Sequence, residues 1–235
     1  MTDEKNLAEQ VYKVIREGIL KRNLLPGMKL SALALSQEMG VSRTPVRLAL
    51  ERLAAEGLVE VRSNQSAQVA RPSSKTVEEV FFMRALLEAE AVRIAASKVR
   101  PADLRTLEDL VDEEQREFHN RHFQGYIKAN RELHMAIARL ADNSLLEKTI
   151  EQFLDQSGVI LSLFDPFYAF EPEEERVNYA EDKAILEALA AKNAGLAASR
   201  MKDHILRAFR NLPLEELEAR TRGMPRLKTR EADPA

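Results

Sequence analysis

Apolar residues recur every three or four positions in the first part of the chain, which is typical of amphipathic helices. The first such helix is defined by five apolar positions: Leu7, Val11, Val14, Ile15 and Ile19. A second, short helix is predicted over residues 33–39, and Gly40 and Val41 form a tight turn behind it. A third helix follows, so the pattern predicts two short helices joined by a glycine turn.

The third helix, predicted over residues 42–58, has recognisable ends and two different faces. A hydroxyl residue, Ser42 or Thr44, would cap its start, and Gly57 would end it. Four apolar residues at helical spacing form one face: Val46, Leu50, Leu53 and Leu58. The opposite face carries three arginines: Arg43, Arg47 and Arg52. We therefore expect this helix to bury one face and to expose a basic one.

Arg43 and Arg47 are four residues apart and share one side of the helix's N-terminal end. A recognition helix that enters the major groove of DNA needs such guanidinium groups opposite a buried face. A surface helix with ordinary solvated arginines is the alternative. Residues 58–61 and 68–70 alternate around the polar residues 63–66, which predicts a two-stranded hairpin, or wing. Together these elements predict a winged helix-turn-helix.

Beyond residue 77 the pattern is helical almost throughout. The predicted helices span residues 76–98, 101–119, 122–140, 143–163, 173–192 and 193–210. The stretch 164–179 contains two prolines and is irregular; it is either a plain loop or a segment that lines a pocket. The predicted fold class is mainly α: an N-terminal winged helix-turn-helix with a small β-hairpin wing, and a C-terminal all-α helical bundle.

A linker containing proline and serine, residues 71–74, separates the two parts. We predict three regions: a DNA-binding domain (1–72), a helical ligand-binding and dimerisation domain (73–212) and a charged tail (213–235) whose end we expect to be disordered. The net charge of −3 argues against a general nucleic-acid binder. However, the first 72 residues carry a net charge of +3 and the remainder −6, so the positive charge lies where DNA binding is predicted.

The composition excludes several classes of protein. The chain has no cysteine, so it has no disulfides, no thiolate zinc site and no cysteine nucleophile. It has no run of 18 apolar residues and no apolar signal segment near its start. We therefore expect a cytoplasmic protein without a membrane partner.

Several segments of the first domain match a known pattern. They are Pro26-Gly27 and Leu30, the run GVSRTPVR (40–47), Ala49-Leu50, Arg52-Leu53 and Glu56-Gly57-Leu58-Val59. Residues 5–71 thereby resemble the DNA-binding domain of the GntR family of bacterial regulators. The resemblance implies that Arg43 and Arg47, with Ser42 and Thr44, contact operator bases and phosphates. We add two residues to this predicted set, Arg52 on the same helix and Asn64 at the wing tip.

The chain departs from the family pattern at two positions of this domain. The family often has Glu where this chain has Ala32, and it commonly has Gly at the wing tip, where this chain has Asn64. Asparagine tolerates the left-handed conformation that such a tip needs. The wing is therefore expected to form, with an altered minor-groove contact.

The second domain carries another set of matches. They are Met83 to Glu88 and on through Ala95-Ala96, Asn130-x-x-Leu-His134, Ala141-Asp142-Asn143, Leu145-Leu146, residues 181–188 and His204. Most of residues 75–210 thereby resembles the FadR-type (FCD) ligand-binding domain. The resemblance implies a homodimer that binds a small organic acid, often beside a metal held by one Asp and three His.

The residues at the metal-site positions are Asn130, His134, Asp182 and His204. Asn130 and His134 are four apart and share a helix face, but Asn130 replaces an Asp and Asp182 replaces a His of the family pattern. Three interpretations remain open: a rearranged site for zinc, nickel or manganese, a metal-free polar pocket, and buried histidines without a ligand. Arg84 is the candidate for binding the carboxylate of an effector; an ion pair with Glu88 is its alternative.

The predicted function is that of a transcriptional regulator, expected to act as a repressor. A dimer would bind a palindromic operator in double-stranded DNA, and a small acid bound in the helical domain would change its affinity. One alternative is a ligand-blind DNA-binding protein with a degenerate pocket. The other is a metal-dependent enzyme that uses His134, Asp182 and His204. The sequence shows no nucleophile–base pair beside these residues, so we predict that the protein is not an enzyme.

Overall fold

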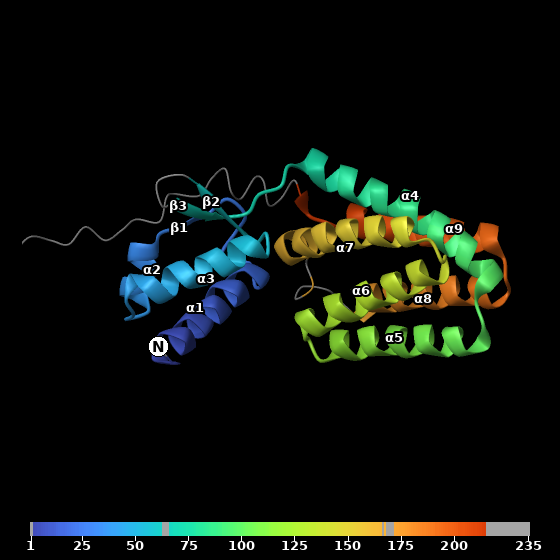
Figure 1. The fold of residues 1–235 in the computed structure, drawn as a ribbon, viewed down its shortest axis with the longest axis horizontal. Helices are drawn as coiled ribbons and strands as arrows, with labels where there is room; N and C mark the ends of the chain where they lie inside the picture. Colours follow the sequence, from blue (N-terminus) through green and yellow to red (C-terminus); the bar gives the residue numbers. More distant parts are fainter. Residues whose placement is uncertain (1, 63–65, 166, 168–171, 215–235) are drawn as a thin grey trace, which may run out of the picture. The chain divides into compact units, whose positions relative to one another are not determined.

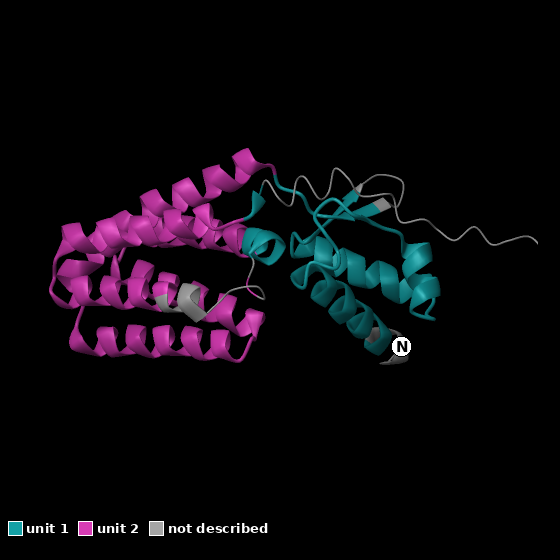
Figure 2. Cartoon of the chain, turned by 180° about the vertical axis from the view of Figure 1, so that it is seen from behind, with its two compact units in different colours: residues 1–72, 159–165, 213–235 teal, residues 73–158, 166–212 magenta. Residues whose placement is uncertain are grey.

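The computed structural model describes residues 2–62, 66–165, 167 and 172–214 (Figure 1). These residues are mostly helical and include one small antiparallel sheet, as the sequence predicts. The chain divides into two compact units, coloured separately in Figure 2. Unit 1 comprises residues 1–72, 159–165 and 213–235, and unit 2 comprises residues 73–158 and 166–212.

The described part of the first 72 residues contains helices and short strands in the predicted order. They are α1 (Thr2–Leu20), β1 (Lys29–Leu30), α2 (Ala32–Glu38), α3 (Arg43–Ala55), β2 (Val59–Arg62) and β3 (Ser66–Val69). The strands form an antiparallel sheet in the order β1-β3-β2, in which Val59 lies opposite Val69 and Lys29 opposite Gln68. The sequence predicted the β2–β3 hairpin but not β1, because a two-residue strand is too short to show alternation.

The core of unit 1 forms where the apolar faces of α1 and α3 meet. Ile15 and Ile19 on α1 are buried, as are Val46 and Leu53 on α3, and these two helices pack against each other. Val14 was predicted to share the buried face, but 55% of it is exposed because it lies at the edge of the apolar stripe. The buried face of α3 therefore fixes which of its residues point outwards.

The remaining helices follow the prediction closely. They are α4 (Ser74–Lys98), α5 (Pro101–His119), α6 (Phe123–Leu140), α7 (Ser144–Phe164), α8 (Pro172–Ala190) and α9 (Ala194–Arg210). Ser73 caps α4 by accepting a hydrogen bond from the Thr76 amide. Pro101 begins α5, where a missing N–H costs nothing. Local capping signals thus account for the positions of these helix starts.

The irregular stretch predicted at residues 164–179 is shorter than expected, because α8 already begins at Pro172. Phe167 is buried and its ring lies 5.1–5.2 Å from the rings of Phe118, Phe123 and Tyr126. This favours the interpretation that the aromatic residue docks on the bundle. Residues 166 and 168–171 lie outside the described part, as do the wing tip with Asn64 and residues 215–235 of the predicted tail.

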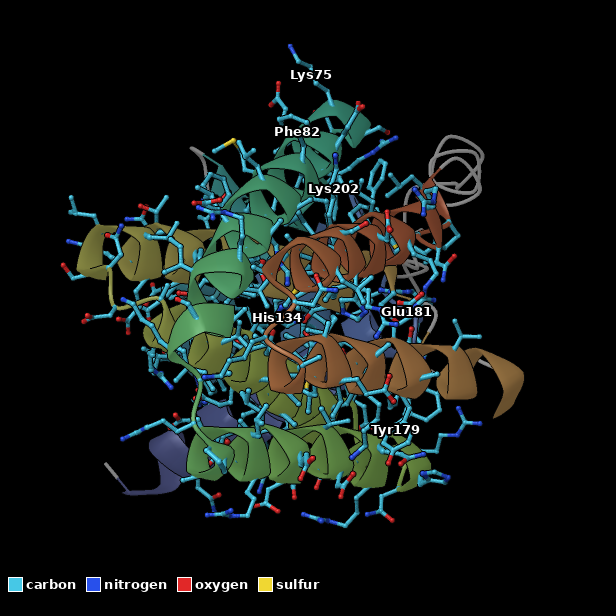
Figure 3. All side chains as sticks on the ribbon, turned by 90° about the vertical axis from the view of Figure 1, so that its right-hand side faces the viewer. Lys75, Phe82, His134, Tyr179, Glu181 and Lys202 are labelled. Carbon is cyan, nitrogen blue, oxygen red and sulfur yellow. The ribbon has the colours of Figure 1, made fainter. Side chains whose placement is uncertain are left out.

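Within unit 2, α4 packs along α9, α5 packs along α6, and α8 contacts both α9 and α5 (Figure 1). Figure 3 shows Lys75 and Phe82 projecting outwards from α4, whereas His134 lies among the helices. Side chains from five helices can therefore meet in the interior of the bundle. Among the described residues, no helix is both long and apolar enough to cross a membrane.

Candidate functional site

The N-terminal end of α3 is placed by two local features. Gly40 adopts φ of 65°, a conformation that glycine accepts without strain, and so turns the chain between α2 and α3. Ser42 occupies the N-cap position of α3 in an extended conformation. The sequence left two alternatives for the residue at the start of this helix, Ser42 and Thr44. The structure has Ser42 at this position.

The predicted base-reading arginines lie on the outward face of α3. Pro45, Val46 and Ala49 are buried, whereas Arg43 and Arg47 are exposed, with Ser42 and Thr44 exposed beside them. Arg47 also borders a shallow groove that Ala32, Leu50, Glu51, Val61 and Ala67 line. Ala32 is one of the two positions at which this domain departs from the pattern it resembles, and its small side chain borders the groove beside Arg47.

Arg52 differs from the other two arginines of α3 in its contacts with α1. Its guanidinium donates to Glu9 over 2.5 Å, lies 3.4 Å from Glu56 and covers the ring of Tyr12 at 3.7 Å. Tyr12 in turn donates to Glu56. These contacts join α3 to α1, which favours a structural role for Arg52; its contact with DNA stays a prediction.

Unit 2 contains a cluster of polar side chains in its interior, all at most 7% exposed. They are Arg84, Glu88, Glu114, His134, Ser157, Asp182 and His204. Asn130 lies next to this cluster and is half-buried. The structure therefore brings together all of the residues predicted for the metal and the effector, and it adds Glu114, which the sequence analysis missed.

One half of the cluster is organised around Glu88. Arg84 donates to Glu88 over 2.7 Å and to Ser157 over 3.1 Å, and Nδ1 of His134 contacts the second oxygen of Glu88. Burial would raise the pKa of Glu88, but Arg84 and His134 lower it to about 2. Burial lowers the pKa of His134. Arg84 therefore forms the ion pair with Glu88 that the sequence analysis gave as the alternative to effector binding. These contacts do not support Arg84 as the residue that binds the effector.

The other half is organised around His204 and Glu181. Nδ1 of His204 lies 3.0 Å from Glu181, and Nε2 lies 3.7 Å from Asp182. Arg207 donates to Glu181 over 2.6 Å. Burial would lower the pKa of His204, but Asp182 and Glu181 raise it. The rings of His204 and His134 stack with their centroids 5.5 Å apart, which joins the two halves.

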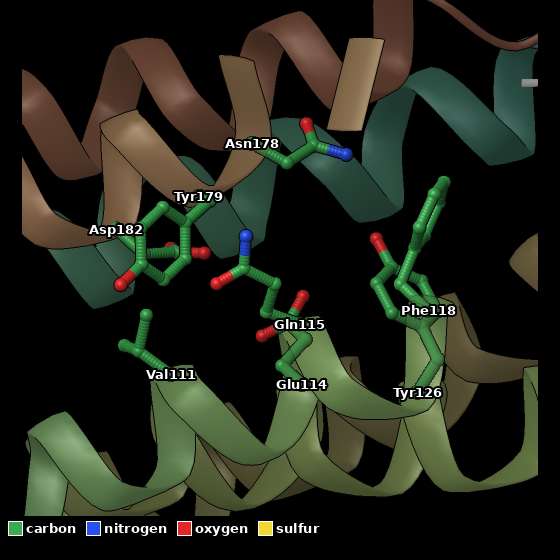
Figure 4. A pocket seen from close by; sticks show the side chains of 8 residues that line it. All are labelled: Val111, Glu114, Gln115, Phe118, Tyr126, Asn178, Tyr179 and Asp182. Carbon is green, nitrogen blue, oxygen red and sulfur yellow. The ribbon is translucent and has the colours of Figure 1, made fainter. Parts of the chain in front are cut away.

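Glu114 and Asp182 face each other across a small cavity between α5 and α8 (Figure 4). Asn130 donates to one oxygen of Glu114 over 3.1 Å. Burial and the neighbouring Asp182 raise the pKa of Glu114 well above its ordinary value, and burial also raises the pKa of Asp182. The sequence held a signal for Glu114: it interrupts the apolar stripe of α5, between Val111 and Phe118.

The four side chains predicted to bind a metal lie near one another, but the described residues do not form a recognised metal-ligand group. Across the part of the chain that the structure describes, no group of three or more His, Cys, Asp or Glu side chains is placed to hold a metal ion. Nδ1 of His134 and Nδ1 of His204 each face a glutamate, which leaves Nε2 as the ring nitrogen that could bind a metal. The amide of Asn130 donates to Glu114. A metal at these residues therefore stays a prediction from the sequence.

Comparison with known proteins identifies both parts of the chain. Residues 7–69 match the family model of bacterial regulatory proteins of the gntR family, and residues 79–207 match the FCD domain. The chain is 28% identical over 143 residues to the HTH-type transcriptional repressor RspR of Escherichia coli, which is 61% of this chain and 63% of RspR. The chain thus spans less than two thirds of the length of that relative.

The similarity to a second Escherichia coli protein covers more of both chains. The HTH-type transcriptional regulator McbR is 29% identical over 188 residues, which is 80% of this chain and 84% of McbR. The solved structure of McbR/YncC superposes with a TM-score of 0.59 at 26% identity and covers 92% of this chain and 98% of the other. The names of these relatives are those of regulators rather than enzymes. The chain therefore belongs to the GntR family of bacterial regulatory proteins and carries an FCD domain.

Proposed function

We propose that this protein is a transcriptional regulator whose binding to operator DNA responds to a small molecule. In this proposal residues 1–72 bind DNA, and residues 73–212 bind the effector and form a homodimer. The observation that carries it is the outward face of α3, where Arg43 and Arg47 are exposed at the leading end of a helix whose other face is buried. The two family matches support this assignment of DNA binding and effector binding to different parts of the chain.

The DNA contact follows from the geometry of α3. Its N-terminal end enters the major groove, where a guanidinium can bind a guanine edge through two hydrogen bonds. The hydroxyls of Ser42 and Thr44, exposed beside these arginines, bind backbone phosphates and fix the register of the helix. A two-fold dimer would place two such helices about one DNA turn apart, so the operator is a near-palindrome.

The effector acts through the buried polar cluster of unit 2. A ligand changes DNA affinity only if it binds one conformation of the protein more tightly than another. A cluster built from six helices is suited to this, because a new charge inside it alters contacts on several helices at once. Repression is the expected outcome, in line with the name of the relative RspR. As a DNA-binding regulator, the protein would work in the bacterial cytoplasm.

The test is selection of binding sites from a random pool of duplex DNA by the purified full chain. We expect one enriched near-palindromic motif and a dimer by light scattering. Arg43→Ala and Arg47→Ala should each lose the enrichment. The matched control is Arg93→Ala, which removes an exposed arginine of α4 that pairs with Glu90, and it should enrich the same motif. A pool without any enriched sequence would contradict the proposal.

A further inference from the structure

Leu48 is a large apolar residue of α3 that the fold leaves exposed. The other large apolar residues of this helix, Val46, Leu50 and Leu53, are at most 5% exposed, whereas Leu48 is 45% exposed. A single exposed leucine is ordinary on a protein surface, so its exposure alone indicates no function. Its place on the helix gives the exposure a meaning.

Leu48 lies on the same outward face as the residues proposed to contact DNA. Thr44 and Arg47 are both exposed on this face. In a helix of 3.6 residues per turn, Arg47 lies about 60° to one side of Thr44 and Leu48 about 40° to the other. Leu48 is therefore at least as close to the middle of this face as Arg47 is.

The side chain of Leu48 is also close enough to the leading end of α3 to reach bases. Leu48 follows Thr44 by one turn, a rise of about 6 Å, and the major groove is about 8.5 Å deep. Long side chains in helices point back towards the N-terminus, which directs Leu48 to the end that enters the groove. Glu51 follows on the same face about 10 Å behind Thr44, beyond this depth.

An apolar side chain in the major groove favours one base over the other three. Adenine, guanine and cytosine present hydrogen-bonding groups at this edge, whereas thymine also presents its C5-methyl group. Leucine offers no hydrogen bond, so covering a donor or acceptor with it costs free energy. The net charge of +3 over the first 72 residues favours DNA over an apolar protein surface as the occupant of this face.

We propose that Leu48 is a specificity-determining residue that packs against the C5-methyl group of a thymine in each half of the operator. The inference rests on the proposed function, since it names a base in the DNA that the regulator binds. Burial of one methyl group contributes about fourfold to affinity. In a dimer the two half-sites together should contribute about fifteenfold.

The experiment measures the affinity of the full chain for its selected DNA by fluorescence anisotropy at constant salt. Each thymine of the half-site is replaced in turn, in both halves, by deoxyuridine, which differs from thymidine only by the missing methyl group. We expect wild-type affinity to fall about fifteenfold at one position. Leu48→Ala should bind the thymine and the uracil duplex of that position equally, because the side chain that detects the methyl group is gone.

Two further variants keep the test sharp. Because Leu48 is on the surface, Leu48→Ala should fold with the wild-type urea midpoint, and Leu48→Asn, a polar residue of similar size, should lose the same preference. The control is Val14→Ala on α1, which shortens an apolar residue that is 55% exposed and should keep the preference. A selected half-site without thymine, unchanged wild-type affinity for every uracil duplex, or an undiminished preference in Leu48→Ala would overturn the proposal.

The same measurements separate this inference from the proposed function. If the chain binds its selected DNA and Arg47→Ala does not, while uracil has no effect at any position, the assignment of Leu48 fails and the regulator stands. If the chain selects no DNA sequence, the regulator itself fails, and the role of Leu48 fails with it.

Discussion

Arg47 and Arg84 each precede a glutamate by four residues on a helix, yet the two pairs lie in opposite environments. Arg47 and Glu51 are exposed on α3, whereas Arg84 and Glu88 are 4% and 2% exposed inside unit 2. In water an ion pair is worth little, so an exposed guanidinium can leave its neighbours for a ligand. In the interior, separating the pair strands a charge. The same spacing thus leaves an exposed arginine, which we propose contacts DNA, in one place and a buried ion pair in the other.

The comparison explains why a match to a family motif does not fix what a residue does. Arg84 occupies a position at which the sequence suggested effector binding, but its guanidinium is already held by Glu88 and Ser157. Among the described residues of the buried cluster, Glu114 and Asp182 each have an oxygen without a hydrogen-bond partner, and no motif marks Glu114. Burial and pairing therefore decide which charged groups are available for a ligand.

The largest expected effect comes from breaking the buried pair. Glu88→Ala leaves Arg84 and His134 buried without their carboxylate, so it should lower the free energy of unfolding by about 3–5 kcal/mol. The matched control is Glu51→Ala on α3, which should stay within about 0.5 kcal/mol of the wild type. Urea unfolding of both variants measures the difference. Equal losses of unfolding free energy in the two variants would contradict the difference between the buried and the exposed residues.

The pH dependence of stability provides a second test of the buried pair of Arg84 and Glu88. The pKa of Glu88 is lowered to about 2 in the folded protein, from an ordinary value of 4.5. The folded state therefore binds the proton less tightly than the unfolded state, and the stabilisation is present above pH 4.5 and is lost as the pH falls towards 2. In Glu88→Gln this contribution should be missing. The difference in unfolding free energy between wild type and variant should shrink over this interval; a constant difference would contradict the assignment.

A smaller effect is expected for Arg52, an exposed residue with several partners. Arg52→Ala removes the contacts with Glu9 and Tyr12 that join α3 to α1. It should lower the urea midpoint of unfolding slightly, because exposed ion pairs contribute little, and should leave the preferred DNA sequence unchanged. Sequence selection by the variant measures the second point. A changed motif would support a contact between Arg52 and DNA.

The sequence predicted most of the fold because its signals are local. The stripe with Val46 and Leu53, the turn at Gly40 and the first-turn prolines each depend on a few neighbouring residues, and helices α4 to α9 begin and end within two residues of the predicted bounds. Strand β1 was missed because its two residues pair with β3, some 40 positions away in the chain. That information is tertiary, and no local pattern contains it.

The candidate site was predicted less completely, since it depends on which side chains meet. Asn130, His134, Asp182 and His204 do lie near one another, but Glu88, Glu114 and Glu181 hold three of them. The sequence named Glu88 only as a partner of Arg84, and Glu114 left a signal that was missed, as a charged residue in the apolar stripe of α5. Which partner each of these buried groups has follows from the tertiary structure, which spacing along the chain does not reveal.

The central claim is that the exposed arginines at the start of α3 read DNA. Its most direct test is the affinity of the full chain for its selected DNA by fluorescence anisotropy, for wild type, Arg47→Ala and Arg52→Ala. The account predicts that Arg47→Ala weakens binding by about 1–3 kcal/mol without changing the urea midpoint, and that Arg52→Ala retains the specificity. Wild-type affinity in Arg47→Ala, together with lost specificity in Arg52→Ala, would contradict it.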